Sequence, residues 1–546
     1  MNSVQAESSK ALTPDRLRTH CDPSQFSFES TAQLADIDVT VGQHRALDSL
    51  RFGLEMRGDG YNVFALGPPG IGKSSATRQI VEELAAHGVA PPDWCYVYNF
   101  SEPHRPNAIR LPPGVGSRLR DDMDQLVEDL QIALPAAFEG EDYRARVEEV
   151  EQSLKERQQH MMEQVSEQAR ERKLSLVHTN AGFGFAPLKN LDEVLPHDEF
   201  VALPESERKK IESDIEAMQQ AVQKSLRQIP QWAKEAREQI KAINREIAES
   251  AVAHFIEVLN TNFADIAELA DYLKAVAADV IDNVDAFLPS QQQSPFGIPP
   301  QNNHNDALRR YQVNLLVDNA AQEHAPVVFE DLPSYLNLIG RTEYQSQMGT
   351  LITNFMLIKP GALHRANGGF LVLDARQILM QPLAWDSLKR ALQSHEIRLD
   401  SLERSFSLIS TVSLEPEHIP LEVKVVLVGD RRLYYLLAQY DPDFADLFKV
   451  MADFNDVTDR NSNANHEFAA LFATLSRQHT LLPLTPGAVA RMIEQTARIA
   501  EDAEKLSTHL GSITDLLREA DHWAKDARCK MIEASHVQHA IDQLIY

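Results

Sequence analysis

The stretch Gly67-Pro68-Pro69-Gly70-Ile71-Gly72-Lys73-Ser74 constrains the fold of this chain more than any other. Its pattern is Gly-x4-Gly-Lys-Ser. The apolar run 61–66 before it predicts a buried strand, and the stretch 74–86 after it predicts a helix. A strand, a glycine-rich loop and a helix in this order are typical of a phosphate-binding loop. We expect Lys73 to contact the β- and γ-phosphates of a nucleotide and Ser74 to ligate Mg²⁺.

The composition limits the classes of partner. With 43% hydrophobic and 24% charged residues over 546 positions, the chain should form several ordinary globular domains. Its net charge of −27 repels phosphate backbones, which disfavours nucleic acid as a partner and a nucleic-acid motor as the function. Three scattered cysteines indicate a reducing compartment. No basic leader and no uninterrupted apolar run of about 18 residues is present, so we expect a cytoplasmic protein without a membrane anchor.

The first hundred residues lead into and out of this loop. Residues 1–38 are polar and predict an N-terminal arm with little core of its own. Aromatic and β-branched residues over 94–100 predict a second strand. The prolines between 103 and 113 then indicate a loop.

A long helical insertion follows. Apolar residues over 143–165 and again over 211–247 recur at alternating three- and four-residue steps in a charged background, which is coiled-coil spacing. Short apolar runs between them predict a small β element near 174–203. We therefore expect an antiparallel helical arm, with a helical bundle folded back on the body as the alternative. Pro230 should kink or divide the second helix.

Beyond a polar linker, the α/β character returns. Residues 370–373 form an apolar run that ends in Asp374, as a Walker B strand does, and such a carboxylate would hold Mg²⁺ beside the loop that contains Lys73. About 300 residues separate Lys73 from Asp374. Helical patterns then fill the C-terminal region, where Thr485-Pro486 indicates a helix start.

Together these patterns predict an α/β fold: a P-loop parallel sheet, which resembles that of AAA+ ATPases, with a long coiled-coil insertion and an all-helical C-terminal lid. The expected boundaries are an N-terminal arm at 1–38, the first part of the α/β domain at 39–116, the insertion at 117–290, a linker at 291–305, the second part of the α/β domain at 306–462, and the lid at 463–546.

Two further stretches, Asn337–Arg341 and Lys359–Gly369, lead into the Walker B strand, and with them the chain resembles the Lon-like branch of the AAA+ ATPases. This resemblance implies a homo-oligomeric ring, a hexamer in this family, with ATP and Mg²⁺ between subunits and polypeptide threaded through the centre. It places Val41 and Gly42 beside the adenine. The family's substrate-gripping pore loops correspond here to Tyr344 and Met348.

From the loop itself and this resemblance, one set of residues is expected to bind the nucleotide. It comprises Val41, Gly42, Gly67, Pro68, Pro69, Gly70, Ile71, Gly72, Lys73, Ser74 and Ser75. An ordinary glycine turn without a ligand is the alternative for the loop.

Several catalytic positions depart from the family pattern. The Glu that would orient the attacking water is replaced by Ala375, and the loss of such a base costs roughly 10²- to 10⁴-fold in rate. Glu330 and Asp386 are possible substitutes, with ordinary strand-end and helix-surface positions as the alternative. Ala375 therefore leaves open whether this predicted ATPase turns over.

The positively charged positions of the family also differ. Lys449 stands where the family supplies a cation to the neighbouring subunit, and a solvated surface charge is its alternative. Asp430 follows Gly429 at the first sensor position. Thr514 occupies the place of a second sensor arginine, for which Arg518 could substitute one helical turn later.

Lon-type proteases also carry a Ser-Lys dyad after the lid, and no such motif is visible before Tyr546. A peptidase domain would then lie downstream or act in trans. The sequence thus favours the ATP-binding, polypeptide-handling module of a Lon-like ATP-dependent protease. The alternative is a nucleotide-gated chaperone or scaffold that binds ATP with little turnover.

Overall fold

The computed structural model describes residues 19–37, 40–179, 182–190, 193–288, 307–347, 350–399 and 414–545. The chain forms two compact units. The first comprises residues 1–119 and 313–546, and the second comprises 120–312. The second unit is therefore one continuous insertion between two stretches of the first.

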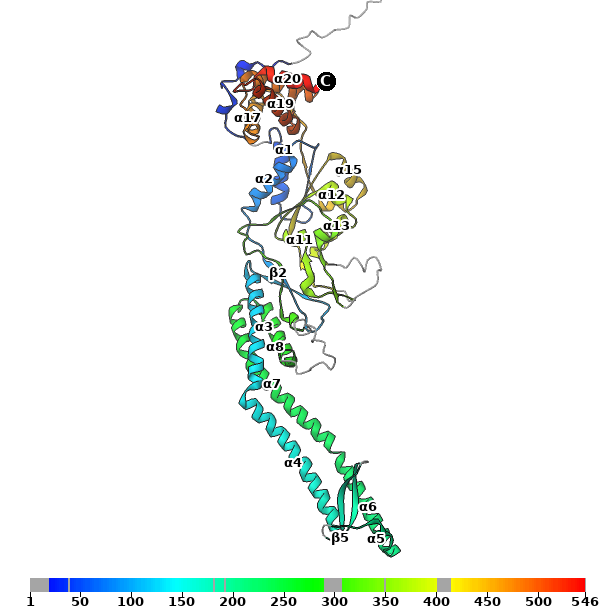
Figure 1. Ribbon diagram of the computed structural model, residues 1–546. Coiled ribbons are helices and arrows are strands. Elements are labelled where there is room, and N and C mark those ends of the chain that lie inside the picture. The colour runs from blue at the N-terminus through cyan, green and yellow to red at the C-terminus, as the bar shows by residue number, and fades with distance from the viewer. Residues whose placement is uncertain are drawn as a thin grey trace, which may run out of the picture. The chain divides into compact units, whose positions relative to one another are not determined.

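A five-stranded parallel sheet organises the first unit (Figure 1). In spatial order its strands are β17 (Val450–Asp453), β1 (Val63–Leu66), β16 (Val423–Gly429), β13 (Gly369–Asp374) and β8 (Val327–Glu330). All are parallel, so their carboxyl ends share one edge. This edge gathers residues that are far apart in the sequence, and the predicted α/β fold class is confirmed.

Alternate residues of the strands enter two different cores. In β1, Val63 and Ala65 pack with helices α1 (His44–Glu55) and α2 (Lys73–Ala85). Phe64 and Leu66 pack on the opposite face. The helices that contribute to that second core are α10 (Tyr335–Ile339), α11 (Ala362–Arg365), α12 (Ala375–Met380), α13 (Ala384–Ser394), α15 (Arg431–Tyr440) and α16 (Phe444–Leu447). Both faces are covered, as the near-continuous apolar strands require.

The second predicted strand exists as β2 (Asp93–Val97), but it lies outside the parallel sheet. It pairs antiparallel with β3 (Asn107–Leu111) and with β7 (Asn314–Val317). The prediction of a continuous loop over the proline-rich stretch was therefore wrong, because β3 occupies the part that is free of proline. Three short antiparallel pairs also lie in this unit: β9 (Gly340–Thr342) with β12 (Ile358–Pro360), β10 (Gln345–Gln347) with β11 (Thr350–Ile352), and β14 (Glu396–Ile397) with β15 (Ile419–Pro420).

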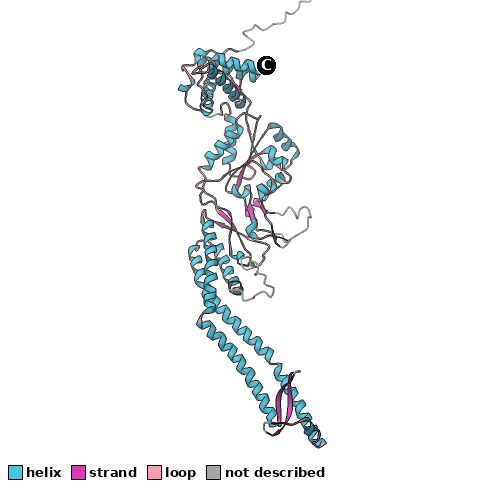
Figure 2. Cartoon of the chain, viewed as in Figure 1, coloured by secondary structure: helices cyan, strands magenta, loops and turns pink. Residues whose placement is uncertain are grey.

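The insertion is dominated by helices (Figure 2). Its elements are α3 (Val115–Glu139), α4 (Glu141–Glu171), β4 (Leu174–Thr179), β5 (Gly182–Asn190), β6 (Glu193–Val194), α5 (His197–Val201), α6 (Glu205–Leu226), α7 (Ile229–Asn262) and α8 (Ala267–Asp282). The second helical run is divided after Leu226, and Pro230 lies in the first turn of α7, as predicted.

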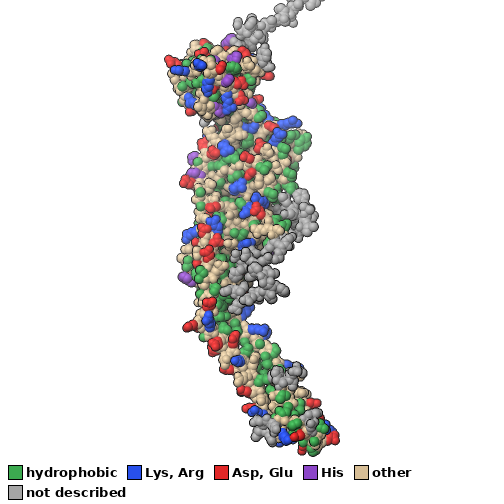
Figure 3. Space-filling model, viewed as in Figure 1, with side chains coloured by type: hydrophobic (Ala, Val, Ile, Leu, Met, Phe, Trp, Pro, Cys, Tyr) green, Lys and Arg blue, Asp and Glu red, His purple; other side chains and the backbone are tan. Residues whose placement is uncertain are grey.

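Ion pairs between the two helical runs fix their direction. Three ion pairs join the runs: Arg146–Glu246 at 2.6 Å, Arg157–Glu235 at 3.6 Å and Arg172–Asp214 at 3.5 Å. As the residue number of the arginine rises, the residue number of its acidic partner falls. The two runs are therefore antiparallel. Charged side chains of both signs cover this part of the chain (Figure 3). Because these pairs are exposed, each contributes at most about 1 kcal/mol.

Four helices form the C-terminal part of the first unit: α17 (Ser462–Gln478), α18 (Pro486–Ile499), α19 (Leu510–Asp526) and α20 (Ala534–Ile545). A short antiparallel pair, β18 (Val457–Asp459) with β19 (Lys505–Ser507), lies beside them. Thr485 caps α18 by accepting from the Ala488 N–H, as its Thr-Pro sequence predicted. Among the described helices, none has both the length and the apolar composition that crossing a bilayer requires.

The described residues of the expected N-terminal arm, 19–37, pack against the C-terminal helices. Its Cys21, Phe26 and Phe28 are buried in the core of the four C-terminal helices. Thr31 exchanges hydrogen bonds with Leu484 there, donating its N–H to the Leu484 carbonyl and accepting the Leu484 N–H on its hydroxyl. Residues 19–37 have no core of their own and gain burial from the lid helices instead.

Candidate functional site

The glycine-rich loop joins β1 to α2 at the carboxyl edge of the parallel sheet. Gly67, Gly70 and Gly72 have φ angles of +156°, +83° and +82°, which residues other than glycine rarely adopt. Gly72 is the N-cap of α2. The loop therefore leads its backbone directly into a helix N-terminus, where unpaired N–H groups and the helix dipole favour a phosphate.

Lys73 lies within this loop. Its ammonium donates to the Gly67 carbonyl at 2.9 Å and to the Pro68 carbonyl at 3.1 Å. Burial lowers the pKa of Lys73, and the nearby carboxylates of Asp374 and Asp430 oppose that shift. Because both carboxylates act on the Lys73 ammonium, the carboxyl ends of β13 and β16 lie near this lysine. In the sequence, about 300 residues separate Lys73 from Asp374.

Asp374 ends β13 and begins α12. Its Oδ1 accepts from the Gln377 N–H at 2.9 Å, which caps the helix and fixes the carboxylate at the sheet edge. Asp430 plays the same part for α15 by accepting from the Leu433 N–H at 2.8 Å. Both carboxylates are exposed at the strand ends, where a divalent cation next to the loop would find oxygen ligands.

Ala375 points away from this edge. Its side chain is fully buried, and a Cβ added to Gly429 would come within 3.0 Å of the Ala375 Cβ. A glutamate at this position would enter the core between α12 and β16. The packing around Ala375 therefore leaves no space for the carboxylate that is usual at this position.

Two cavities meet at the loop. One, of about 600 Å³, is lined by Ser74, Ser75, Arg78, Gln79, Glu82, Phe329, Glu330, Asp331, Val372, Leu373, Asp374, Gln377 and Val428. The other, of about 760 Å³, is lined by Thr40, the loop, the start of α2 and residues of α17 and α19. The two cavities share Ser74, Ser75 and Gln79. Together they provide space for a polyphosphate near Asp374 and for a nucleoside between Thr40 and α19.

The start of α19 contacts the loop directly. The Gly511 N–H donates to the Gly70 carbonyl at 3.1 Å. His509 caps α19 by accepting the Ser512 N–H on Nδ1 at 3.1 Å, and its Nε2 would lie 2.6 Å from a Cβ added to Gly70. The lid therefore packs against the outer side of the glycine-rich loop.

The residues proposed as a second sensor lie close by. Thr514 and Arg518 both line the larger cavity. The Arg518 guanidinium pairs with Asp515 at 3.5 Å and is about half exposed, so it is held beside the cavity by a weak surface contact.

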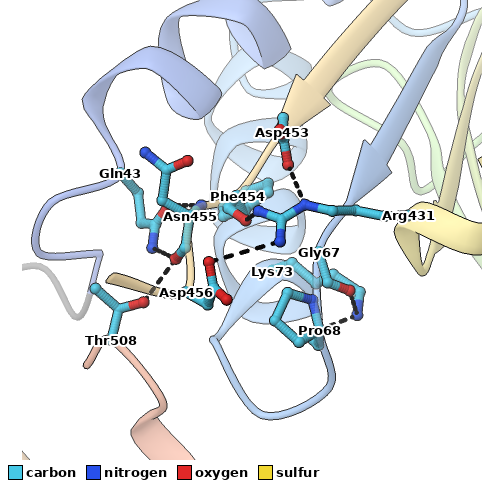
Figure 4. Close-up of polar contacts among 10 residues, drawn as sticks. All are labelled: Gln43, Gly67, Pro68, Lys73, Arg431, Asp453, Phe454, Asn455, Asp456 and Thr508. Carbon is cyan, nitrogen blue, oxygen red and sulfur yellow. Dashed lines mark hydrogen bonds and ion pairs between the residues drawn. The ribbon is translucent and has the colours of Figure 1, made fainter. Parts of the chain in front are cut away.

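The segment that follows β17 connects these parts (Figure 4). Gln43, which is 2% exposed, donates to the Asn455 carbonyl at 2.7 Å and accepts the Asn455 N–H at 2.8 Å. Thr508 of the lid donates to the same carbonyl at 2.6 Å. Arg431 pairs with Asp453 at 2.9 Å and donates to the Phe454 carbonyl at 2.9 Å. Residues 453–456 therefore join the start of α15, the segment before α1, and the lid.

The predicted adenine-binding pair lies in this neighbourhood. Gly42 has a φ of +74° directly before Gln43. Val41 packs against the core of the lid helices, as does Leu510. The sequence had indicated Val41 and Gly42, but it gave no sign that the next residue, Gln43, binds Asn455.

Other predicted residues lie elsewhere. Lys449 stands immediately before β17, so it is at the opposite edge of the sheet from Lys73, and its ammonium donates to the Asp59 carbonyl at 2.8 Å. It is no part of this chain's own site, and its action on a neighbouring subunit stays a prediction. Tyr344 lies between β9 and β10, and Met348 falls outside the described residues.

Comparison with known families covers the segment that contains Asp374 and most of the lid. A LonB-like AAA domain matches residues 323–455, and the LID domain of the archaeal LonB AAA+ ATPase matches residues 483–546. The resemblance to Lon-like AAA+ proteins is confirmed. The Lon-like LonC helical domain also matches residues 93–126. The chain thus carries an AAA+ ATPase module of the Lon-like type, and such modules bind nucleotide.

Individual proteins show more limited similarity. A Lon protease homologue of Escherichia coli strain K12 is 29% identical over 153 residues, which are 27% of this chain and 25% of that protein. The match therefore spans about a quarter of the relative's length. Two crystal structures of NtrX from Brucella abortus, one in complex with ATP, share 13% identity with TM-scores of 0.26 and 0.25. They cover 43% and 49% of this chain, and 46% and 60% of NtrX.

Proposed function

We propose that this chain is the ATP-binding and polypeptide-handling module of a Lon-like ATP-dependent protease. The observation that carries the proposal is the meeting of Lys73 and Asp374 at one sheet edge beside a glycine loop. In the sequence these residues are separated by the whole helical insertion. A glycine turn without a ligand would need neither the carboxylate nor the cavities on both sides.

The residues present fit a nucleotide with Mg²⁺. The positive φ angles of Gly67, Gly70 and Gly72 leave the loop open to close approach of phosphate oxygens. The Lys73 ammonium would exchange its two carbonyl acceptors for phosphate oxygens. Ser74 and Asp374 would hold the metal, which neutralises phosphate charge when it is bound.

The remaining parts would serve polypeptide handling. The insertion at 117–290 would capture or gate substrate, and Tyr344 with Met348 would grip it in the pore of a homo-oligomeric ring, a hexamer by family resemblance. The lid at 463–546 would follow the nucleotide state through its contacts with Gly70 and Asn455. A peptidase domain would act downstream or in trans, and the setting would be the cytoplasm.

A nucleotide-gated chaperone or scaffold is the second candidate. It is favoured by Ala375, whose buried methyl leaves no room for the carboxylate that the family uses to orient water. Such a protein would change conformation on binding ATP without hydrolysing it at a useful rate.

Binding and turnover of purified protein separate these candidates. A fluorescent ATP analogue should bind the wild-type chain in the presence of Mg²⁺ and lose at least about tenfold in affinity in Lys73→Ala. The matched control is Lys530→Ala, an exposed lysine between α19 and α20, which should bind as wild type does. Undiminished binding by Lys73→Ala refutes the site.

Steady-state ATP hydrolysis is then measured with and without casein as an unfolded polypeptide. Turnover that casein stimulates supports the protease module. Tight binding without turnover above that of Lys73→Ala supports the scaffold.

A further inference from the structure

The end of β8 brings a second carboxylate to the phosphate side of the site. β8 runs parallel to β13, with Glu330 opposite Leu373. Neighbouring strands lie about 4.8 Å apart. Asp331 follows the end of β8, and Asp374 is the last residue of β13, so the two carboxylates belong to neighbouring segments at the same edge of the sheet. Both line the cavity of about 600 Å³ that also contains Ser74.

Glu330 and Asp386, which the sequence suggested as substitutes for the missing glutamate, are poorly suited to orient a water molecule. Both carboxylate oxygens of Glu330 are engaged, one by the Arg365 guanidinium at 3.0 Å and the other by the Leu332 N–H at 3.2 Å. Its charge is thus neutralised, and its side chain holds the end of β8 in place. Asp386 is 70% exposed on α13, pairs with Lys389 at 3.6 Å, and does not line the cavity.

Asp331 differs from both. It is exposed on the cavity wall, and within the described part of the chain its carboxylate has no hydrogen-bond or ion-pair partner. A carboxylate that is free of partners and next to a phosphate site can accept a hydrogen bond from water. Ala375 cannot supply such a group, because its side chain faces the core.

We propose that Asp331 orients the attacking water for ATP hydrolysis at this site, in place of the glutamate that Ala375 replaces. This proposal rests on the proposed function, since it requires ATP in the loop. The water oxygen forms a bond to the γ-phosphorus, and the bond from the γ-phosphorus to the β–γ bridging oxygen breaks. ADP leaves with that oxygen, phosphate retains the water oxygen, and the water proton passes to Asp331 and then to solvent.

The test compares Asp331→Asn with wild type in binding and in single-turnover hydrolysis. Asparagine keeps the size but cannot accept the proton. We expect the affinity for the fluorescent ATP analogue to stay within about twofold and the hydrolysis rate to fall by about 10²- to 10⁴-fold. Asp331→Glu should recover part of the rate. Asp386→Asn is the matched control, an exposed carboxylate outside the cavity, and should hydrolyse as wild type does.

Rescue by the conservative variant excludes a purely structural effect. Asp331→Glu should recover part of the rate at unchanged affinity for the ATP analogue, because the reaction requires a carboxylate at this position. Hydrolysis by Asp331→Asn within about twofold of wild type overturns the proposal. So does a loss of binding equal to the loss of rate, which would make Asp331 a binding residue.

The remaining outcomes separate the two proposals. If the wild type binds ATP but does not hydrolyse it above Lys73→Ala, the role of Asp331 is refuted while nucleotide binding stands. If the wild type does not bind ATP, the proposed function fails as well.

Discussion

Replacing Gln43 by alanine tests whether the segment after β17 joins the nucleotide site to the lid. The variant loses two hydrogen bonds to Asn455, at 2.7 and 2.8 Å. Each contributes about 1 kcal/mol, and the Asn455 N–H loses its partner at a further cost of up to about 1 kcal/mol for a half-buried group. The Asn455 carbonyl keeps its bond from Thr508. We therefore expect this segment to lose about 2–3 kcal/mol of local stability.

Hydrogen exchange measured by mass spectrometry reports the local stability of this segment. It does not require that a chain of two units unfolds in one step. Peptides that cover 453–459 should exchange about 25- to 150-fold faster in Gln43→Ala, since about 1.4 kcal/mol corresponds to a factor of ten. Peptides of the helical insertion should be unchanged. Weaker binding of the ATP analogue should accompany the change, because Gln43 follows the predicted adenine-binding pair.

Thr508→Val is the matched control. It removes one of two donors to the Asn455 carbonyl and leaves the Asn455 N–H paired, so its effect should be about 1 kcal/mol. Equal exchange in Gln43→Ala and Thr508→Val, or no acceleration in either, would show that these hydrogen bonds do not hold the segment.

Three further substitutions test other parts of the structure. Gly70→Ala should weaken ATP-analogue binding at least about tenfold in a fluorescence titration, because a left-handed backbone costs roughly 1–2 kcal/mol for alanine and the new Cβ meets His509; unchanged affinity would contradict this. Ala375→Glu should lower the denaturation midpoint, with a loss of about 3 kcal/mol or more from burying a carboxylate, and should not raise ATP hydrolysis. Burial lowers the pKa of His364 to about 3, so the folded state binds fewer protons than the unfolded state, and stability falls as the pH drops below about 6.5. The loss should reach about 2 kcal/mol at pH 5 in urea titrations and be smaller in His364→Asn.

Local patterns were sufficient for the glycine-rich loop and its flanks. The motif that ends in Ser74, the apolar run before it and the helical stretch after it are contiguous, so their order predicts their geometry. The same holds for the Walker B strand that ends at Asp374 and for the helix start at Thr485. The division before Pro230 was equally predictable, because proline suits only the first turn of a helix.

Features that depend on distant pairing were not predictable. β3 occupies a stretch whose flanking prolines indicate a loop, and it is a strand because β2 pairs with it. The segment that contains Phe26 and Phe28 is too polar for a core of its own, yet it is buried against helices more than 400 residues away. No local periodicity records either partner.

The carboxylate that could stand in for the missing glutamate has to be sought among neighbouring strands, because strand order matters more than sequence distance at this site. In the sequence, the position next to Asp374 is Ala375, and its residue type alone suggests a site without a base. In the parallel sheet, β8 pairs with β13 as far as Glu330 opposite Leu373, and Asp331 and Asp374 are the next residues along the two segments. A side chain that follows the end of a strand points either toward the core or toward the cavity at the sheet edge. The side chain of Ala375 is buried in the core. In the role proposed for Asp331, the adjacent segment supplies the carboxylate, so a missing glutamate in the motif does not by itself mean a missing carboxylate at the site.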